Sequence, residues 1–330
     1  MEHLAENFLR DQLQGRRQKL EAVIPGSSEH AQLSSLLREV DSALERMEKG
    51  TYGICEACHD PVETERLLTD PLTCYCLDHL TETGRRELEQ DLELAAMMQR
   101  SLLPQQNLRH KGWEIHHHFA PLGAVSGDYC DVMTGESGND GLFFALGDAA
   151  GKGVAASMLM AQLHAIFRTL LSSHPPLALS TMVERAGRVF RESAMSPYFA
   201  TLVCGRANAS GEVELVNAGH CAPLVIRNGM VSRLEAGGLP LGLFAEGRYP
   251  THTLKLDRGD CLFAFTDGLL EARSASGEEF GEHRVEELAT RNHPLPAAKF
   301  IQNCVSALSD FRRGEQPLDD LSMMVICRNE

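Results

Sequence analysis

The spacing of apolar residues changes along this chain, and the change divides it into two regions. In residues 1–48, apolar side chains recur every three or four positions between charged ones, as at Leu33, Leu37 and Val40. This period predicts amphipathic helices. A Pro-Gly-Ser-Ser segment at residues 25–28 interrupts the pattern, so we expect a helical hairpin with a short turn.

A further helix is expected from about residue 83 to residue 103, because Pro104 disfavours helical backbone in the residue before it. Its apolar seam advances in alternating steps of four and three, through Leu88, Leu92, Ala95, Gln99 and Leu102. Two interpretations remain open. The helix packs on its own neighbour as an ordinary amphipathic helix, or it is a linker that dimerises or relays a signal.

From Trp113 onward, short apolar runs are separated by glycines and by longer helical patterns. The runs predict strands at residues 142–146, 201–205, 213–217, 224–227, 261–266 and 322–327. Helices are expected at residues 153–171, 177–194 and 297–311. Hairpin-like strands beside long helices favour the α+β class, with a β-sandwich covered by helix layers.

Composition and charge narrow the function. The net charge is −15, with 43% hydrophobic and 23% charged residues, as in ordinary globular proteins. No basic face of the kind that nucleic-acid binding requires is apparent, so no nucleic-acid partner is expected. No apolar run approaches the roughly 20 residues that span a bilayer, and the N-terminus lacks a signal-peptide pattern. We therefore expect a cytoplasmic protein without a membrane partner.

The ten cysteines fall into two groups. Four crowd into residues 55–76, and six are scattered singly through apolar stretches: Cys130, Cys204, Cys221, Cys261, Cys304 and Cys327. The scattered cysteines are expected to be small buried core residues rather than disulfide partners.

The clustered cysteines have the spacing of a structural zinc site. Cys55 and Cys58 form one pair with a two-residue spacer, and Cys76 and His79 form the second. Such pairs direct four ligands at one ion and leave no open position, which indicates one structural Zn²⁺. Cys74 is the spare thiol.

Residues 44–58, LERMEKGTYGICEAC, resemble the DksA/TraR zinc-finger family, in which a helix runs through Gly-Thr-Tyr-Gly into the first CxxC. The resemblance covers about residues 30–80. His79 stands where that family has its last cysteine, and the hairpin tip lacks the acidic residues with which the family probes RNA polymerase. Polymerase binding is therefore not carried over, and a dimerising or sensory module is expected.

Four acidic motifs stand out in the second region, and each places aspartate at the edge of an apolar strand beside glycine or a turn. They are SGDYCD (residues 126–131), GDAAGKG (147–153), TDG (266–268) and DDLS (319–322). Mg²⁺ and Mn²⁺ prefer such oxygen ligands. Two of these ions can share one carboxylate and one water, and that water attacks phosphorus in line. The motifs therefore predict a two-metal hydrolase.

These motifs, with NAGH at residues 217–220 and GLPLG at residues 238–242, resemble the SpoIIE/RsbU branch of the PPM (type 2C) protein phosphatases. The resemblance covers about residues 90–328. It implies two Mn²⁺ or Mg²⁺ ions at one end of a β-sandwich. By motif position, Asp148 bridges both ions, the carbonyl of Ala149 reaches one, Asp128 serves the second, and Asp267 and Asp319 complete the first. Asp320 would orient these groups without binding an ion.

Histidines give weaker signals. His220 is either a hydrogen-bonded turn residue or a catalytic acid, and both interpretations stay open. Residues 116–118 are three consecutive histidines within an expected strand. Because adjacent strand residues point to opposite faces, these three are not expected to converge on one ion.

The resulting hypothesis is a metal-dependent phosphoserine/threonine protein phosphatase. We expect a hairpin and zinc finger at residues 1–80, a regulatory helix at 81–104 and the phosphatase domain at 105–330. By family analogy, the substrate is a small anti-sigma-factor antagonist in bacterial partner switching, and the N-terminal module regulates the enzyme. A homodimer through the module or the helix is one expectation. The alternative function is a regulatory binding protein that contacts transcription machinery and uses the phosphatase fold as a scaffold.

Overall fold

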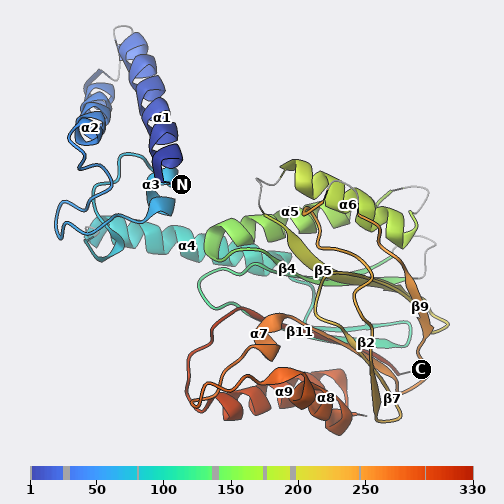
Figure 1. The fold of residues 1–330 in the computed structure, drawn as a ribbon. Coiled ribbons are helices and arrows are strands. Elements are labelled where there is room, and N and C mark those ends of the chain that lie inside the picture. Colours follow the sequence, from blue (N-terminus) through green and yellow to red (C-terminus); the bar gives the residue numbers. More distant parts are fainter. Residues whose placement is uncertain are drawn as a thin grey trace. The chain divides into compact units, whose positions relative to one another are not determined.

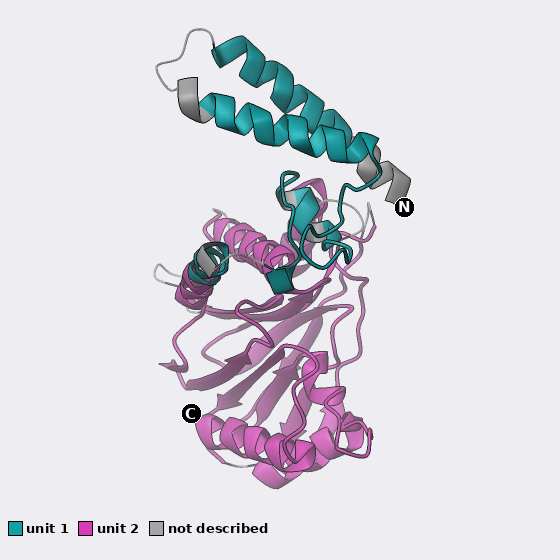
Figure 2. Cartoon of the chain, turned by 90° about the vertical axis from the view of Figure 1, so that its left-hand side faces the viewer, with its two compact units in different colours: residues 1–91 teal, residues 92–330 magenta. Residues whose placement is uncertain are grey.

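The computed structural model describes residues 2–24, 30–79, 82–135, 141–173, 177–193, 198–244, 247–293 and 295–329. The expected hairpin tip at residues 25–28 lies outside the described residues. The chain divides into two compact units, residues 1–91 and 92–330 (Figure 2). This division falls inside helix α4 (Glu82–Leu102), and the three-part division expected from the sequence stays a prediction.

In the first unit, helices α1 (Glu2–Val23) and α2 (His30–Glu48) pack on each other. The short helices α3 (Thr64–Thr69) and η2 (Leu77–His79) follow. Apolar residues from both long helices and from the cysteine-rich segment form one core, including Leu13, Val40, Met47, Cys55 and Cys76. The cysteine segment is therefore part of this unit's hydrophobic core, and the helices alone do not complete it.

The second unit contains two antiparallel sheets (Figure 1). The six-stranded sheet has the order β1-β2-β11-β10-β7-β8, and the five-stranded sheet has the order β3-β4-β5-β6-β9. The strands are β1 (Asn107–His110), β2 (Trp113–Ala120), β3 (Asp128–Thr134), β4 (Leu142–Ala149), β5 (Ala200–Ala207), β6 (Glu212–Ala218), β7 (Leu224–Arg227), β8 (Met230–Arg233), β9 (His252–Lys255), β10 (Cys261–Phe265) and β11 (Leu321–Arg328).

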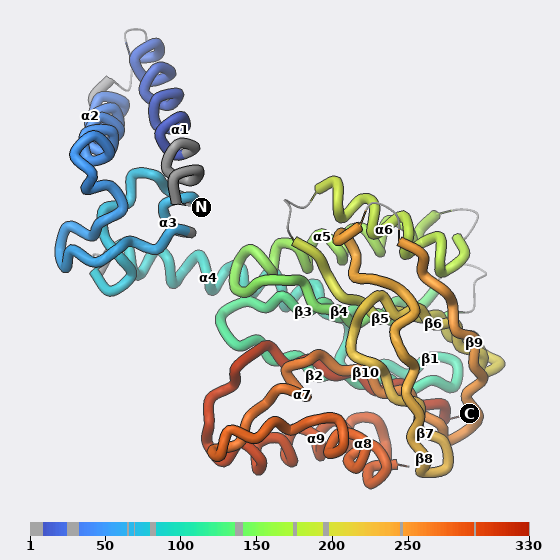
Figure 3. Tube along the Cα trace, in the orientation of Figure 1, coloured from blue at the N-terminus to red at the C-terminus, as the bar shows by residue number. Residues whose placement is uncertain are grey.

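Helices cover the outer faces of both sheets. Helices α5 (Gly153–Leu171) and α6 (Leu179–Ser193) share a core with the five-stranded sheet. Helices α8 (Gly281–Asn292) and α9 (Ala297–Arg312) share a second core with the six-stranded sheet. A third core lies between the sheets, and the trace in Figure 3 follows this layering. The expected helix-flanked sandwich is confirmed.

The layering explains why the central strands appear in the sequence as continuous apolar runs. In β11, Met324 and Ile326 pack between the sheets, whereas Met323 and Val325 pack under the helices. Both faces of the strand are therefore buried, so its sequence does not alternate between polar and apolar residues.

The prediction for the scattered cysteines is wrong for two of them. Cys261 and Cys327 lie directly opposite each other on β10 and β11 and form a disulfide. The other four, Cys130, Cys204, Cys221 and Cys304, are free and buried or half-buried, as expected. Sequence alone could not pair the two, because 66 positions separate them and only the strand register brings them together.

Among the described residues, α5 is one helix that is long and apolar enough to cross a bilayer by length and composition alone. The sequence pattern did not indicate it, because polar residues interrupt the apolar positions. Its buried residues, including Leu163 and Phe167, pack into the core against the five-stranded sheet. This core therefore explains the apolar residues on the buried face of α5.

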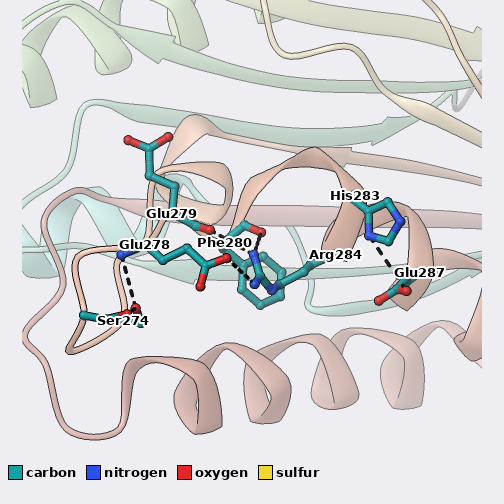
Figure 4. A network of polar contacts seen from close by, with 8 residues as sticks. Ser274, Glu278, Glu279, Phe280, His283, Arg284 and Glu287 are labelled. Carbon is teal, nitrogen blue, oxygen red and sulfur yellow. Dashed lines mark hydrogen bonds and ion pairs between the residues drawn. The ribbon is translucent and has the colours of Figure 1, made fainter.

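A polar network fixes the chain between the short helix α7 (Asp267–Leu270) and α8. The guanidinium of Arg284 donates to the Glu278 carboxylate at 2.6 Å and to the carbonyls of Glu279 and Phe280 at 3.1 and 3.0 Å (Figure 4). It also lies 4.9 Å from the Phe311 ring centroid. The segment that follows α7 is thus tied to both α8 and α9.

Candidate metal centre and active site

Two of the predicted ligands come from neighbouring strands of the five-stranded sheet. Asp128 opens β3 and lies directly opposite Asp148 in the β3–β4 register. Asp128 is only 1% exposed, and its Oδ2 accepts a hydrogen bond from the Thr266 hydroxyl at 3.2 Å. Antiparallel pairing therefore places both carboxyl groups at the same end of the sandwich.

The other two ligands come from the six-stranded sheet. Strand β10 ends just before Asp267, and β11 begins just after Asp319 and Asp320. Because β10 and β11 are antiparallel neighbours, the end of one meets the start of the other. The Thr266 amide donates to the carbonyl of Ser322 at 2.9 Å and closes this junction. The structure thus brings all four predicted aspartates to one edge.

Asp320 connects the two sheets. Its Oδ1 accepts from the Leu122 amide at 2.6 Å, and its Oδ2 accepts from the Gly127 amide at 2.9 Å. Both carboxylate oxygens therefore hold the loop that precedes Asp128. Asp319 has a different environment, because its Oδ2 lies 3.0 Å from the Lys152 ammonium.

Glycines beside the aspartates allow close backbone approach. A Cβ atom on Gly127 would lie 2.9 Å from the carbonyl oxygen of Ala149, and one on Gly268 would lie 1.9 Å from that of Asp320. Neither position can accept a side chain without moving backbone. The glycines of the SGD and TDG motifs are therefore required by packing at the edge where the aspartates meet.

Acidic groups gather at this edge, and the Lys152 ammonium that pairs with Asp319 offsets their charge only in part. Burial, together with the neighbouring charges of Asp267 and Asp319, raises the pKa of Asp148 to about 7. Burial also raises the pKa of Asp128 well above its ordinary value and raises that of Asp267. Like charges at close range oppose ionisation, and divalent cations would remove that opposition.

The oxygen donor set suits Mg²⁺ or Mn²⁺. Within the described ranges, these carboxylates do not form a closed cluster of three or more ligand atoms such as the cysteine site described below.

His220 lies beside this edge in a tightly bonded turn. Its Nδ1 is 2.8 Å from the Thr201 hydroxyl, and its backbone amide donates to the Asn217 side chain at 2.9 Å. Burial lowers the pKa of His220 to about 4, so the ring is neutral near pH 7. These contacts favour the turn interpretation over that of an acid that donates a proton.

The three consecutive histidines alternate along β2 as expected. His117 is buried, whereas His116 and His118 are half-buried. The Nδ1 of His116 lies 2.5 Å from the side-chain oxygen of Asn107. In the described part of the chain, no metal-ligand cluster includes these histidines.

The sequence analysis missed two residues that support the aspartates. Thr266 is fully buried and bonds Asp128, and Gln99 bonds the backbone of Ser126 at 2.6 and 3.0 Å. Thr266 lies inside the TDG motif, so its hydroxyl group next to a predicted ligand could have indicated this role. Gln99 was assigned to the apolar seam, where its polarity was the signal.

The second candidate metal site is the cysteine cluster of the first unit. One ligand atom from each of Cys55, Cys58, Cys76 and His79 lies within 4.8 Å of the others. The Sγ atoms of Cys58 and Cys76 are 3.7 Å apart, and the Sγ of Cys76 is 3.3 Å from Nδ1 of His79. Ligands bound tetrahedrally at about 2.0–2.3 Å from zinc have nearly this separation, so the four residues fit the ion.

Comparison with known proteins identifies the second region. Residues 138–329 match the family of Stage II sporulation protein E (SpoIIE), which is more than half of the chain. The chain belongs to the SpoIIE family. This membership confirms the phosphatase resemblance, and it leaves the DksA/TraR-like zinc finger as a prediction.

Two curated relatives extend the similarity of this SpoIIE-family chain. Protein IcfG of Synechocystis is 27% identical over 267 residues, which cover 72% of this chain and 42% of IcfG. The phosphoserine phosphatase RsbU of Bacillus subtilis is 25% identical over 261 residues, which cover 76% of this chain and 74% of RsbU. The chain therefore spans less than half of the first relative and about three quarters of the second.

Solved structures share the fold of this SpoIIE-family chain. The SiaA-PP2C domain of Pseudomonas aeruginosa matches with a TM-score of 0.65 and 17% identity, over 76% of this chain and all of that domain. The SpoIIE phosphatase domain of Bacillus subtilis, with a regulatory fragment, matches with a TM-score of 0.54 and 18% identity, over 68% of this chain and 64% of that chain. RsbX in complex with magnesium matches with a TM-score of 0.51 and 15% identity, over 67% of this chain and 98% of RsbX. These structures show that the chain has the PP2C phosphatase fold.

Proposed function

We propose that this SpoIIE-family protein hydrolyses phosphoserine or phosphothreonine in a protein substrate and depends on two divalent cations, Mn²⁺ or Mg²⁺. The observation that carries the proposal is the convergence of Asp128, Asp148, Asp267 and Asp319 on one edge of the sandwich. The pKa values of three of them are raised by burial and by one another. Ions of this class satisfy such a cluster.

The proposed ligands divide between the two ions by their position. Asp148 is central, because its pKa is raised by both Asp267 and Asp319, and it would bridge the ions. Asp267 and Asp319 would complete the coordination of one ion, and Asp128 would be a ligand of the other. The carbonyl of Ala149 would bind one of the two ions. When bound, the ions supply a water that ionises near neutral pH and neutralise charge on the phosphoryl oxygens.

Other side chains keep these groups in place. The Thr266 hydroxyl donates to Asp128 and so favours its ionised, ligating form. Asp320 uses both oxygens for the Leu122 and Gly127 amides, so its role is to orient the loop. Lys152 pairs with Asp319 at an exposed position.

The relatives support a proposal for the substrate class. RsbU is a phosphoserine phosphatase, and the resemblance to its branch implies a small anti-sigma-factor antagonist as the phosphoprotein. We extend this substrate class to the present chain and place regulation in its N-terminal module. This extension rests on shared motifs and fold, together with the acidic edge.

The test is phosphate release from a phosphoserine-bearing antagonist protein by the full chain, measured with and without Mn²⁺. We expect turnover with Mn²⁺ and loss of turnover after chelation, because the proposed reaction needs the ions to activate water. A matched phosphothreonine substrate measures the preference between the two residues. Metal-independent phosphate release, or none from any phosphoprotein, would refute the proposed function.

We also propose that Cys55, Cys58, Cys76 and His79 hold one structural Zn²⁺. Support comes from the spacing of the four ligand atoms and from the burial of Cys55 and Cys76 in the core of the first unit. Four protein ligands leave no position for substrate, so the ion would stabilise the fold of this unit.

Cys74 provides the matched control for the zinc site. It lies in the same segment, but its thiol donates to the carbonyl of Leu72 at 3.2 Å and stands outside the four-ligand cluster. Elemental analysis of the purified chain should find one zinc in the wild type and in Cys74→Ser, and none in Cys58→Ser. Equal zinc content in both variants would contradict the assignment.

A further inference from the structure

Helix α4 carries a buried amide on its packed face. Gln99 is only 6% exposed, and its side chain bonds the backbone of Ser126 in both directions. Nε2 donates to the Ser126 carbonyl at 2.6 Å, and Oε1 accepts from the Ser126 amide at 3.0 Å. The side chain thus pairs with the loop as a neighbouring strand would.

The bonded residue is the start of the segment that positions the acidic edge. The Ser126 hydroxyl accepts from the Asp128 amide at 3.0 Å. Gly127 donates to Asp320 at 2.9 Å and accepts from the Ala149 amide at 3.1 Å. Residues 126–128 therefore include the predicted ligand Asp128, and they bond to α4 and to residues of both sheets.

The rest of the helix face makes the position of Gln99 specific. Ala96 is buried beside it, and Leu102 packs on the core under α5 and α6. Met97 and Met98 lie on the opposite side, 62% and 60% exposed. One residue corresponds to about 100° around a helix, so a rotation of α4 by about that angle would replace the amide with a methionine or arginine and leave the Ser126 backbone groups unpaired.

We propose that Gln99 is a positioning residue, which fixes residues 126–128 so that Asp128 and Asp320 keep the cation site assembled. Movement of α4 would release this segment and weaken cation binding. The inference rests on the proposed function for its activity readout, but the bonds themselves do not depend on it. Helix α4 links the two units in sequence. Through the contact between Gln99 and Ser126, this helix can control the site.

The experiment compares Gln99→Leu and Gln99→Glu with Met98→Ala in the full chain. Leucine keeps the size but bonds neither backbone group, and glutamate keeps the acceptor but turns the donor into a repelling oxygen. We expect each Gln99 variant to need roughly tenfold more Mn²⁺ for half-maximal phosphate release, with the KM for phosphoprotein changed less than twofold. Met98→Ala, on the exposed face, should match the wild type.

Hydrogen exchange gives a readout that does not need activity. In the Gln99 variants, the amides of Ser126 and Gly127 should exchange faster while the strands keep wild-type protection. If leucine lowers the melting temperature strongly, the glutamate variant decides. Wild-type Mn²⁺ dependence and wild-type exchange in a folded Gln99 variant would overturn the inference. An inactive wild type with faster exchange in the variants would instead refute only the proposed function.

Discussion

Replacing Asp148 with asparagine is expected to lower phosphate release by at least about a thousandfold, which corresponds to about 4 kcal/mol of transition-state stabilisation. The loss is expected because Asp148 is the proposed bridge and has no equivalent neighbour. Its partner across the strand pair, Asp128, faces Thr266 instead. Steady-state rates at saturating Mn²⁺ measure the effect. A variant within tenfold of the wild type would remove Asp148 from the centre of the account.

The same substitution should stabilise the metal-free protein. Folding raises the pKa of Asp148 from 3.8 to about 7, so at pH 8 the ionised group disfavours the folded state. Asparagine removes this penalty, and we expect a gain of roughly 2 kcal/mol in the free energy of unfolding at pH 8 with chelator present. The gain should shrink as pH falls through about 7 and vanish below about pH 3, where Asp148 is protonated in both states.

Asp319→Asn is the control for this stability effect. Asp319 pairs with the Lys152 ammonium at 3.0 Å, so its removal abolishes this attraction together with its repulsion of Asp148 and Asp267, and the two effects offset each other. We expect Asp319→Asn to lose phosphatase activity without gaining metal-free stability. Denaturant unfolding in chelator at pH 8 separates the two variants. Equal stabilisation of both would show that general charge reduction, and not the buried position of Asp148, is responsible.

Gly268→Ala is expected to cost roughly 3 kcal/mol of folding free energy and to abolish activity. The added Cβ would lie 1.9 Å from the carbonyl oxygen of Asp320 and 2.9 Å from its carbonyl carbon. Both are backbone atoms, so α7 and the start of β11 must separate. Asp267 and Asp319 would then move apart, and the change should appear both in unfolding free energy and in Mn²⁺-dependent turnover.

Gly141→Ala gives the matched comparison. A Cβ there would meet only the Ala207 carbonyl oxygen, at an ordinary 3.6 Å. We expect this variant to lie within about 0.5 kcal/mol of the wild type and to keep full activity. If Gly268→Ala behaved like Gly141→Ala, the close approach of α7 to Asp320 would not be needed for the site.

Much of the fold could be predicted because the core strands are buried on both faces. Strands β4, β10 and β11 stand out as apolar runs, and the expected helix at residues 153–171 coincides with α5. Strand β3 was missed, because it contains two aspartates, and α8 was missed because it is short and largely charged. Both elements pack in the core, but their polar and charged residues obscure the apolar periodicity.

The aspartates of the site could be predicted from the sequence, but the groups that hold them in place could not. Each aspartate adjoins a glycine or a turn, so motif order was sufficient to find them. The supports are backbone groups: Asp320 holds the Leu122 and Gly127 amides, and Gln99 holds Ser126. Such bonds depend on loop conformation and on contacts nearly 200 positions apart, and no residue pattern encodes them.

The most direct test of the account is the number of Mn²⁺ ions that the full chain binds, measured by titration with the free ion monitored by electron paramagnetic resonance. The account predicts two ions per wild-type chain and a loss of high-affinity binding in Asp148→Asn, whereas Cys58→Ser should keep both ions. A wild type that binds no Mn²⁺, or an Asp148→Asn variant that binds two with unchanged affinity, would contradict it.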